Sequence, residues 1–324
     1  SDWSSDVCSS DLGVMKVLSA DIGGTNARFA LANLTPEGAV WLNRRVFSSQ
    51  EASFEEALRE IIRTRDGIDD VRAVVIAAAG PVENGRVQMT NAAFSVDVRL
   101  VKNLFQSARV LLVNDFQAQA WGLDFPGIEN SLEVLCEEGP VFSSPVRTVI
   151  GAGTGFGTGW LLTGESSAVI ASELGHIPMT FTSEEREIER FYQSIYPDTP
   201  LTVEHVLSGR GLTLLNVYYT GSESEPALFT HDAGFDASDT CATFARFYGR
   251  AARTAALAVL TQSLVIGGGI ARKSPCLVKH PNFLAEFLNY RGPHLNYLKR
   301  IRLFLDTTGD LGLFGTLALA RKTV

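Results

Sequence analysis

The sequence has no run of basic residues and no long apolar stretch. Its 28 Lys and Arg stand against 36 Asp and Glu, a net charge of -8, so its surface is poorly suited to collecting nucleic-acid phosphates or anionic lipids. The longest apolar stretch, Ala255 to Ile270, is interrupted by polar residues and three glycines and cannot form a membrane span. We therefore expect no nucleic-acid partner and no membrane partner.

Cysteine and histidine are scarce and scattered. The four cysteines form no C-x-x-C pair, and none of the five histidines has metal-ligand spacing with another, so neither a zinc site nor a disulfide framework is indicated. This usage fits a reducing, cytoplasmic location.

The N-terminal segment has neither the apolar core nor the basic start of a signal peptide. It looks like a translated sequencing adapter. We therefore expect residues 1–14 to be an unstructured artefact and the native chain to start near Met15.

Two common nucleotide-binding motifs are also missing. The sequence contains no Gly-Lys pair, which excludes a Walker A loop, and no G-x-G-x-x-G register fits its glycine-rich segments. An anionic ligand would then depend on backbone N–H groups and a metal ion.

The 324 residues, 45% apolar and 20% charged, are enough for two globular lobes around a cleft.

Hydrophobic periodicity predicts elements of both kinds along the chain. Ser53 and Glu56 form a capping box that opens an amphipathic helix. Two apolar runs end at polar or turn residues, as buried strands do. The predicted elements are a hairpin over 17–32, a helix over 53–65, strands over 71–79 and 110–113, a second hairpin over 148–162, helices over 184–196, 212–219 and 237–261, a strand over 264–266 and a last helix over 311–321.

The first hairpin carries the segment Asp21-Ile22-Gly23-Gly24-Thr25-Asn26-Ala27-Arg28. Two adjacent glycines let the backbone approach a phosphate and direct N–H groups at it, while Thr25 adds a hydroxyl donor. Asp21, at the end of the strand, is placed to hold Mg²⁺ directly or through water. A tight hairpin turn with a capping Asp would give the same local pattern.

The second hairpin has a glycine at every second position from Gly151 to Gly159. So many glycines weaken a strand, which indicates that a ligand or a backbone contact requires them. A flexible turn is the alternative, although a turn alone would not need them all.

Taken together, these motifs resemble the ATPase-fold sugar kinases, and within that superfamily they are most similar to the bacterial glucokinases. The resemblance runs from Met15 to the C-terminus. It is carried by Asp21 to Arg28, Met89 to Asn91, Val113 to Phe116, Gly151 to Gly157, Glu173 to His176, Glu204 to Leu212, Gly267 to Ile270 and Gly312 to Gly315.

The resemblance implies an α/β, two-lobed ribonuclease H-like fold of the actin and hexokinase type, each lobe a mixed sheet flanked by helices. The expected small lobe comprises residues 15–125 and 308–324, and the expected large lobe residues 126–307. The same resemblance implies ATP and Mg²⁺ as cofactors, glucose as the phosphate acceptor and a homodimer.

Residue by residue, the resemblance implies that Asp115 is the catalytic base, since phosphoryl transfer needs a carboxylate to orient the sugar hydroxyl and accept its proton. The implied sugar-binding residues are Thr90, Asn91, Asn114, Asp115, Glu173, His176 and Glu204. The implied nucleotide-binding residues are Asp21, Gly23, Gly24, Thr25, Asn26, Gly153, Thr154, Gly155, Gly209, Gly267 and Gly268, with Asp21 also at the Mg²⁺.

Two segments depart from the family pattern. Ala92-Ala93-Phe94 follows Thr90-Asn91 where the family has a nearby Trp, and Leu174 replaces a glycine of the family's Glu-Gly-Gly-His. These departures keep two other functions open. One is a kinase of another hexose, and the other is a sugar sensor of the same fold without activity.

Overall fold

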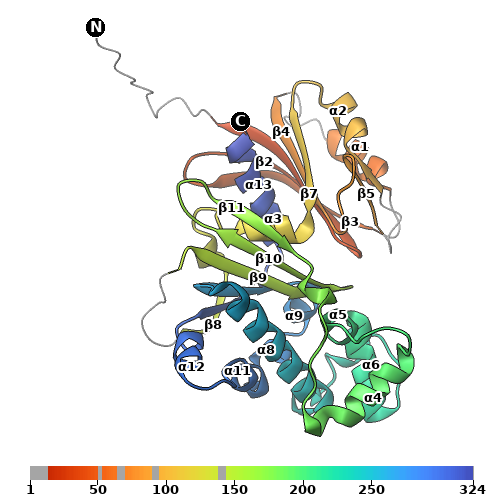
Figure 1. The fold of residues 1–324 in the computed structure, drawn as a ribbon. Helices are drawn as coiled ribbons and strands as arrows, with labels where there is room; N and C mark the ends of the chain where they lie inside the picture. Colours follow the sequence, from red (N-terminus) through yellow and green to blue (C-terminus); the bar gives the residue numbers. More distant parts are fainter. Residues whose placement is uncertain (1–13, 50–52, 64–69, 90–94, 138–143, 324) are drawn as a thin grey trace. The chain divides into compact units, whose positions relative to one another are not determined.

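The computed structural model describes residues 14–49, 53–63, 70–89, 95–137 and 144–323. The chain divides into two compact units, one made of residues 1–128 and 312–324 and the other of residues 129–311 (Figure 1). None of the helices in these described ranges combines the length and the apolar character that a membrane span requires.

The first unit is built on a five-stranded mixed sheet in the order β3-β2-β1-β4-β7. Its strands are β1 (Met15–Ile22), β2 (Asn26–Leu34), β3 (Ala39–Ser48), β4 (Val71–Ala78) and β7 (Arg109–Asn114). β1, β2 and β3 pair antiparallel, whereas β1, β4 and β7 run parallel. The predicted hairpin is confirmed. The parallel register aligns Ile22 with Ala78 and Ala78 with Asn114, so three strands end at one edge of the sheet.

Helices cover both faces of this sheet. α1 (Phe54–Arg63) and α2 (Val98–Leu104) share one apolar core with β1, β2 and β4. The predicted capping box is confirmed, because the Glu56 carboxylate accepts from the Ser53 N–H at 2.8 Å. α3 (Asp115–Gly122) packs against β4 and β7. The remaining elements are β5 (Arg86–Gln88), β6 (Ser95–Asp97) and α13 (Leu311–Thr323), and the short helix η1 (Ile128–Ser131) spans the point in the sequence where the first unit ends.

The second unit contains a six-stranded sheet in the order β11-β10-β9-β12-β13-β8. Its strands are β8 (Glu133–Cys136), β9 (Val146–Ala152), β10 (Phe156–Leu162), β11 (Ala168–Ser172), β12 (Ser263–Gly267) and β13 (Arg302–Leu305). β9 occupies the place that β1 has in the first unit. On one side of it β10 and β11 follow, each antiparallel to its neighbour, and on the other side β12 and β13 follow in parallel pairs. The two sheets therefore share one strand order, and β8 adds an antiparallel edge to the second.

The helices of the second unit are η2 (Leu174–His176), η3 (Ser183–Glu185), α4 (Arg186–Ile195), α5 (Val203–Val206), α6 (Gly209–Thr220), α7 (Pro226–Phe229), η4 (Phe235–Ala237), α8 (Asp239–Val259), α9 (Gly269–Lys273), α10 (Cys276–Lys279), α11 (Pro281–Phe287) and α12 (Pro293–Leu298). Figure 1 shows α8 along one face of the β9–β10 sheet with α11 beside it. The predicted helices over 184–196, 212–219 and 237–261 are confirmed as α4, α6 and α8.

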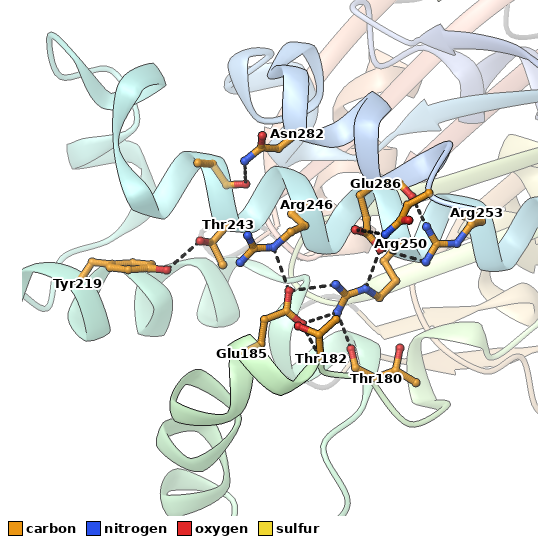
Figure 2. A network of polar contacts seen from close by, with 12 residues as sticks. Thr180, Thr182, Glu185, Tyr219, Thr243, Arg246, Arg250, Arg253, Asn282 and Glu286 are labelled. Atoms are coloured by element: carbon orange, nitrogen blue, oxygen red, sulfur yellow. Dashed lines mark hydrogen bonds and ion pairs between the residues drawn. The ribbon is translucent and has the colours of Figure 1, made fainter. Parts of the chain in front are cut away.

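A network of buried charges centred on Arg250 of α8 ties the second unit together (Figure 2). Its guanidinium donates two hydrogen bonds to Glu185, at 2.7 and 2.9 Å, one to Glu286 at 3.1 Å and one to the carbonyl of Thr180 at 2.7 Å. The side chains of Arg250 and Glu185 are only 6% and 2% exposed. Burial alone would raise the pKa of Glu185, but hydrogen bonds from Arg250 and the Thr182 N–H hold it below its ordinary value.

We predict that Arg250→Met lowers the free energy of unfolding by about 3 kcal/mol, the lower end of the cost of breaking a buried ion pair. The buried Glu185 carboxylate loses its two-bond partner and keeps only Arg246, whereas Glu286 keeps Arg253. Urea denaturation followed by circular dichroism measures the loss. The matched control is Arg59→Met: Arg59 is half-exposed and pairs with Glu55 one helical turn away, an interaction of about 0.3–0.5 kcal/mol. Equal losses for the two variants would contradict the prediction.

Candidate functional site

The first glycine loop, Gly23–Asn26, joins β1 to β2 and is closed by its own backbone. The N–H of Gly23 donates to the carbonyl of Asn26 at 2.9 Å. Ser49, at the end of β3, holds the loop from behind, since its hydroxyl donates to Gly23 O at 2.9 Å and its N–H to Thr25 O at 3.0 Å. The Thr25 side chain is exposed at the tip of the loop, where a ligand could reach it.

Asp21 and Asp115 are two acidic groups of the same edge of the first sheet. The Asp21 carboxylate lies 3.6 Å from the guanidinium of Arg28 and is 12% exposed. Burial, together with the nearby charge of Asp21, raises the pKa of Asp115 to about 7. A carboxyl group with such a pKa exchanges its proton at neutral pH, as a general base must.

Asn114, rather than Asp115, is the N-cap of α3. Its side-chain oxygen accepts from the N–H groups of Phe116 and Gln117 at 2.9 and 3.3 Å, and its amide donates to Gly80 O at 3.2 Å. Asp115 is therefore the first residue of the helix. Because both ends of the Asn114 amide have partners within the protein, its sugar-binding role stays a prediction.

The start of α13 packs directly on this part of the first unit. A Cβ on Gly312 would lie 2.7 Å from the Asp21 carboxylate, and a Cβ on Gly315 would lie 1.7 Å from the carbonyl oxygen of Ala118 in α3. Both positions thus require glycine. The C-terminal helix thereby fixes Asp21 and the helix that begins with Asp115.

The second glycine loop, Gly153–Phe156, joins β9 to β10 and is surrounded by the other predicted glycines. Gly153 donates its N–H to Gly155 O and accepts from the N–H of Gly209, both at 2.8 Å. Gly268 has a φ of +83°, and a Cβ there would lie 2.5 Å from Ala152 O. The structure therefore brings Gly209 and Gly268 beside the loop, and Thr154 is exposed at its tip.

The predicted sugar segments lie against the same loop. A Cβ on Gly175 would lie 2.2 Å from the carbonyl oxygen of Phe156, so η2 touches the end of the loop. Nε2 of His176 lies 3.7 Å from the exposed Glu173 carboxylate. On the other side, Oε2 of Glu204 accepts a 2.9 Å hydrogen bond from the Phe156 N–H.

Leu174, where the resemblance leads us to expect a glycine, is accommodated without backbone strain. Among the described residues, the only non-glycine residues with positive φ are Asn84 and Leu260, so Leu174 needs no glycine conformation. Its side chain is buried in the core of the second unit. The following Gly175 is the position where a side chain would collide with Phe156.

The predicted residues thus fall into two groups. The first unit gathers Asp21, Gly23, Gly24, Thr25, Asn26, Asn114 and Asp115, and the second gathers Gly153, Thr154, Gly155, Glu173, His176, Glu204, Gly209, Gly267 and Gly268. Thr90 and Asn91 lie outside the described residues.

Sequence reasoning missed the roles of Ser49, Arg28 and the α13 glycines. Arg28 and Gly312 to Gly315 belong to motifs that were recognised. The signals for their roles were the opposite charges of Asp21 and Arg28 and the two glycines one helical turn apart in the last helix. Nothing near Ser49 in the sequence indicates that it holds a loop 26 residues away.

The comparisons with known proteins agree with each other. A family model described as Glucokinase matches residues 18–323. A glucokinase of Rhizobium etli is 30% identical over 94% of this chain and 91% of its own length. The crystal structure of a glucokinase from an Antarctic psychrotroph is 29% identical, with a TM-score of 0.80 over 95% of this chain and 99% of its own.

A more distant structure shares the fold alone. A ROK family glucokinase from Streptomyces griseus, in complex with glucose and AMPPNP, has a TM-score of 0.63 and 20% identity over 95% of this chain and 99% of its own. These matches confirm the fold class predicted from the sequence.

We predict that Gly315→Ala destabilises the protein by about 1–3 kcal/mol, because its methyl group must push α13 away from the backbone of α3. Alanine is normally the better helix former by about 1 kcal/mol, so the expected sign is opposite to that of propensity. Thermal unfolding measures the change. The control is Gly38→Ala, where a Cβ meets nothing within 4 Å. A Gly315→Ala protein more stable than wild type would contradict the prediction.

Proposed function

Because the chain belongs to the glucokinase family, we propose that it transfers the γ-phosphate of ATP to the 6-hydroxyl of glucose, giving glucose 6-phosphate and ADP. The family membership confirms the resemblance seen in the motifs. The observation that supports the reaction most directly is Asp115, a carboxyl group with a pKa of about 7 at the start of α3.

Asp115 is the proposed general base. In phosphoryl transfer the protein mainly positions the groups, and a carboxylate orients the acceptor hydroxyl and takes its proton. The pKa of about 7 suits this work, because the ionised form is available at neutral pH and is still basic enough to accept a proton.

Asp21 is the proposed Mg²⁺ residue, directly or through water. Its carboxylate is close enough to Asp115 for the two negative charges to disfavour each other, and a divalent cation would relieve that repulsion, so the donor set fits. Among the described residues no cluster of three or more His, Cys, Asp or Glu could hold a metal, so water and phosphate oxygens would complete the coordination. When bound, the ion neutralises phosphate charge.

The two glycine loops are the proposed phosphate contacts. Gly23, Gly24, Thr25 and Asn26 belong to the first, and Gly153, Thr154 and Gly155 to the second. Both are hairpin connections. The carbonyls of Gly23, Thr25, Asn26, Gly153 and Gly155 already have partners in the protein, and the exposed hydroxyls and glycine backbone are available for an anion. Gly209, Gly267 and Gly268 are the proposed adenosine contacts.

The proposed sugar ligands are Thr90, Asn91, Asn114, Asp115, Glu173, His176 and Glu204. Carboxylates suit this role because each accepts two or more hydrogen bonds from hydroxyls. Glu173 and His176 are exposed on η2, and Glu204 is partly buried in α5. The difference in exposure indicates that Glu173 and His176 can adapt to a ligand more easily than Glu204.

The proposal includes a cytoplasmic homodimer. The described cysteines, Cys136, Cys241 and Cys276, are free thiols, which fits a reducing compartment. The dimer is expected from the family resemblance alone, and sedimentation of the protein in solution tests it.

The first test is ATP- and Mg²⁺-dependent phosphorylation by the protein started at Met15, with glucose, mannose, fructose, galactose and N-acetylglucosamine as acceptors. We expect selective turnover of glucose. In Asp115→Asn we expect kcat to fall by about 10²- to 10⁴-fold, the usual contribution of a general base, with glucose binding retained. Asp70→Asn is the control, because the Asp70 side chain is 88% exposed.

Each other outcome has a defined meaning. Turnover of another sugar would assign a different hexose kinase and place the cause in the altered sugar segments. Sugar binding without any turnover would favour the non-catalytic sensor. Wild-type kcat in a folded Asp115→Asn protein would contradict the assignment of the base.

The pKa of Asp115 also predicts a pH dependence. Below about pH 7 the carboxyl group of the enzyme without Mg²⁺ is protonated and cannot accept the sugar proton. The value of kcat/KM for MgATP, which reports the free enzyme, therefore rises with pH through this region and then levels off. We expect kcat/KM to fall about tenfold per unit at pH values well below 7. A profile that stays flat down to about pH 5 would contradict this assignment.

A further inference from the structure

Glu204 differs from the other predicted sugar ligands because its carboxylate is part of the second glycine loop. Oε2 accepts the 2.9 Å hydrogen bond from Phe156 N–H. Gly155 packs on the same group, since a Cβ there would lie 2.3 Å from Oε2 and 2.9 Å from Cδ. A side chain at Gly155 would therefore displace Glu204.

The segment that carries Glu204 holds this loop at both ends. Glu204 binds the last residue of the loop, and the N–H of Gly209 donates to the carbonyl of Gly153, its first residue, at 2.8 Å. Between them Val206 and Leu207 are fully buried, and Ser208 caps α6. The segment is thus anchored in the core, and its two contacts fix the span of the loop.

The backbone of Phe156 joins the two kinds of predicted site. Its N–H binds Glu204, its carbonyl touches Gly175 of η2, and its side chain packs in the core beside Tyr248. Oε1 of Glu204 accepts no hydrogen bond within the part of the chain that the structure describes. One carboxylate oxygen therefore binds the loop while the other stays available to a ligand.

We propose that Glu204 is a positioning residue for the second phosphate loop, in addition to its sugar contact. This inference rests on the proposed function. A hydrogen bond between a charged group and a backbone N–H is among the stronger ones, and its loss leaves a buried donor unpaired. The geometry therefore makes nucleotide affinity depend on Glu204 even when no sugar is bound.

Glu173 provides the matched control. It is the same residue type with the same predicted sugar role, yet its side chain is 88% exposed and lies 3.7 Å from His176. Among the described residues it makes no hydrogen bond to the second loop. A purely sugar-binding carboxylate should behave like Glu173 when it is removed.

The experiment measures the Kd of Mg²⁺–AMPPNP by calorimetry without sugar, in wild type, Glu204→Ala, Glu204→Gln and Glu173→Ala. We expect Glu204→Ala to weaken nucleotide binding about tenfold, the effect of one lost charged hydrogen bond. Glu173→Ala should leave this Kd within about twofold. Glu204→Gln keeps an acceptor for the Phe156 N–H and should restore most of the affinity. Both alanine variants should weaken glucose binding.

Glu204→Met, which matches the length of Glu but has no acceptor, replaces the alanine variant if circular dichroism shows that Glu204→Ala is unfolded. Unchanged nucleotide affinity in a folded Ala or Met variant overturns the proposal, and so does equal weakening in Glu173→Ala. A wild-type protein that binds no AMPPNP and phosphorylates no sugar would instead contradict the proposed function.

Discussion

Backbone packed directly on backbone is the constraint on which both groups of candidate residues depend. In the first unit, Gly315 of α13 lies against the carbonyl of Ala118, and this contact fixes the helix that begins with Asp115. In the second, Gly268 lies against Ala152 and Gly175 against Phe156. None of these positions has room for a Cβ, so the spacing of the elements follows from the absence of side chains. Binding groups placed on such rigid supports lose little freedom when a ligand arrives.

The secondary-structure elements that carry the candidate residues could be predicted from local sequence patterns. The two glycine hairpins, the strand that ends at Asn114 and the capping box at Ser53 each involve residues near one another in the chain. Their physics is contained in short windows of sequence. The strand order could also be expected, because the family resemblance extends over the whole chain. The edge strands β3, β8 and β11 were missed, since none of them contains a fully buried residue and none forms the continuous apolar run by which the buried strands were recognised.

Contacts between distant residues could not be predicted in this way. Glu204 binds Phe156 across 48 residues, and Arg250 binds Glu185 across 65. No local pattern pairs them, because each partner alone is an ordinary polar residue. The N-cap of α3 could not be predicted for a different reason. Asn114 and Asp115 are both residue types that favour the N-cap position, and only the backbone geometry shows that Asn114 occupies it.

The contact between Gly315 and Ala118 also bears on how the chain folds as it is synthesised. The first unit needs residues 312–323 to complete its packing, whereas the second is one continuous segment, residues 129–311. Domains generally fold as units while the chain emerges from the ribosome. The middle of the chain can therefore reach its final packing first, while the N-terminal sheet waits for the last helix. Until then α13 is not packed against the backbone of α3 at Ala118. We therefore expect chaperones to bind mainly the N-terminal third of the nascent chain, which stays incompletely packed longest.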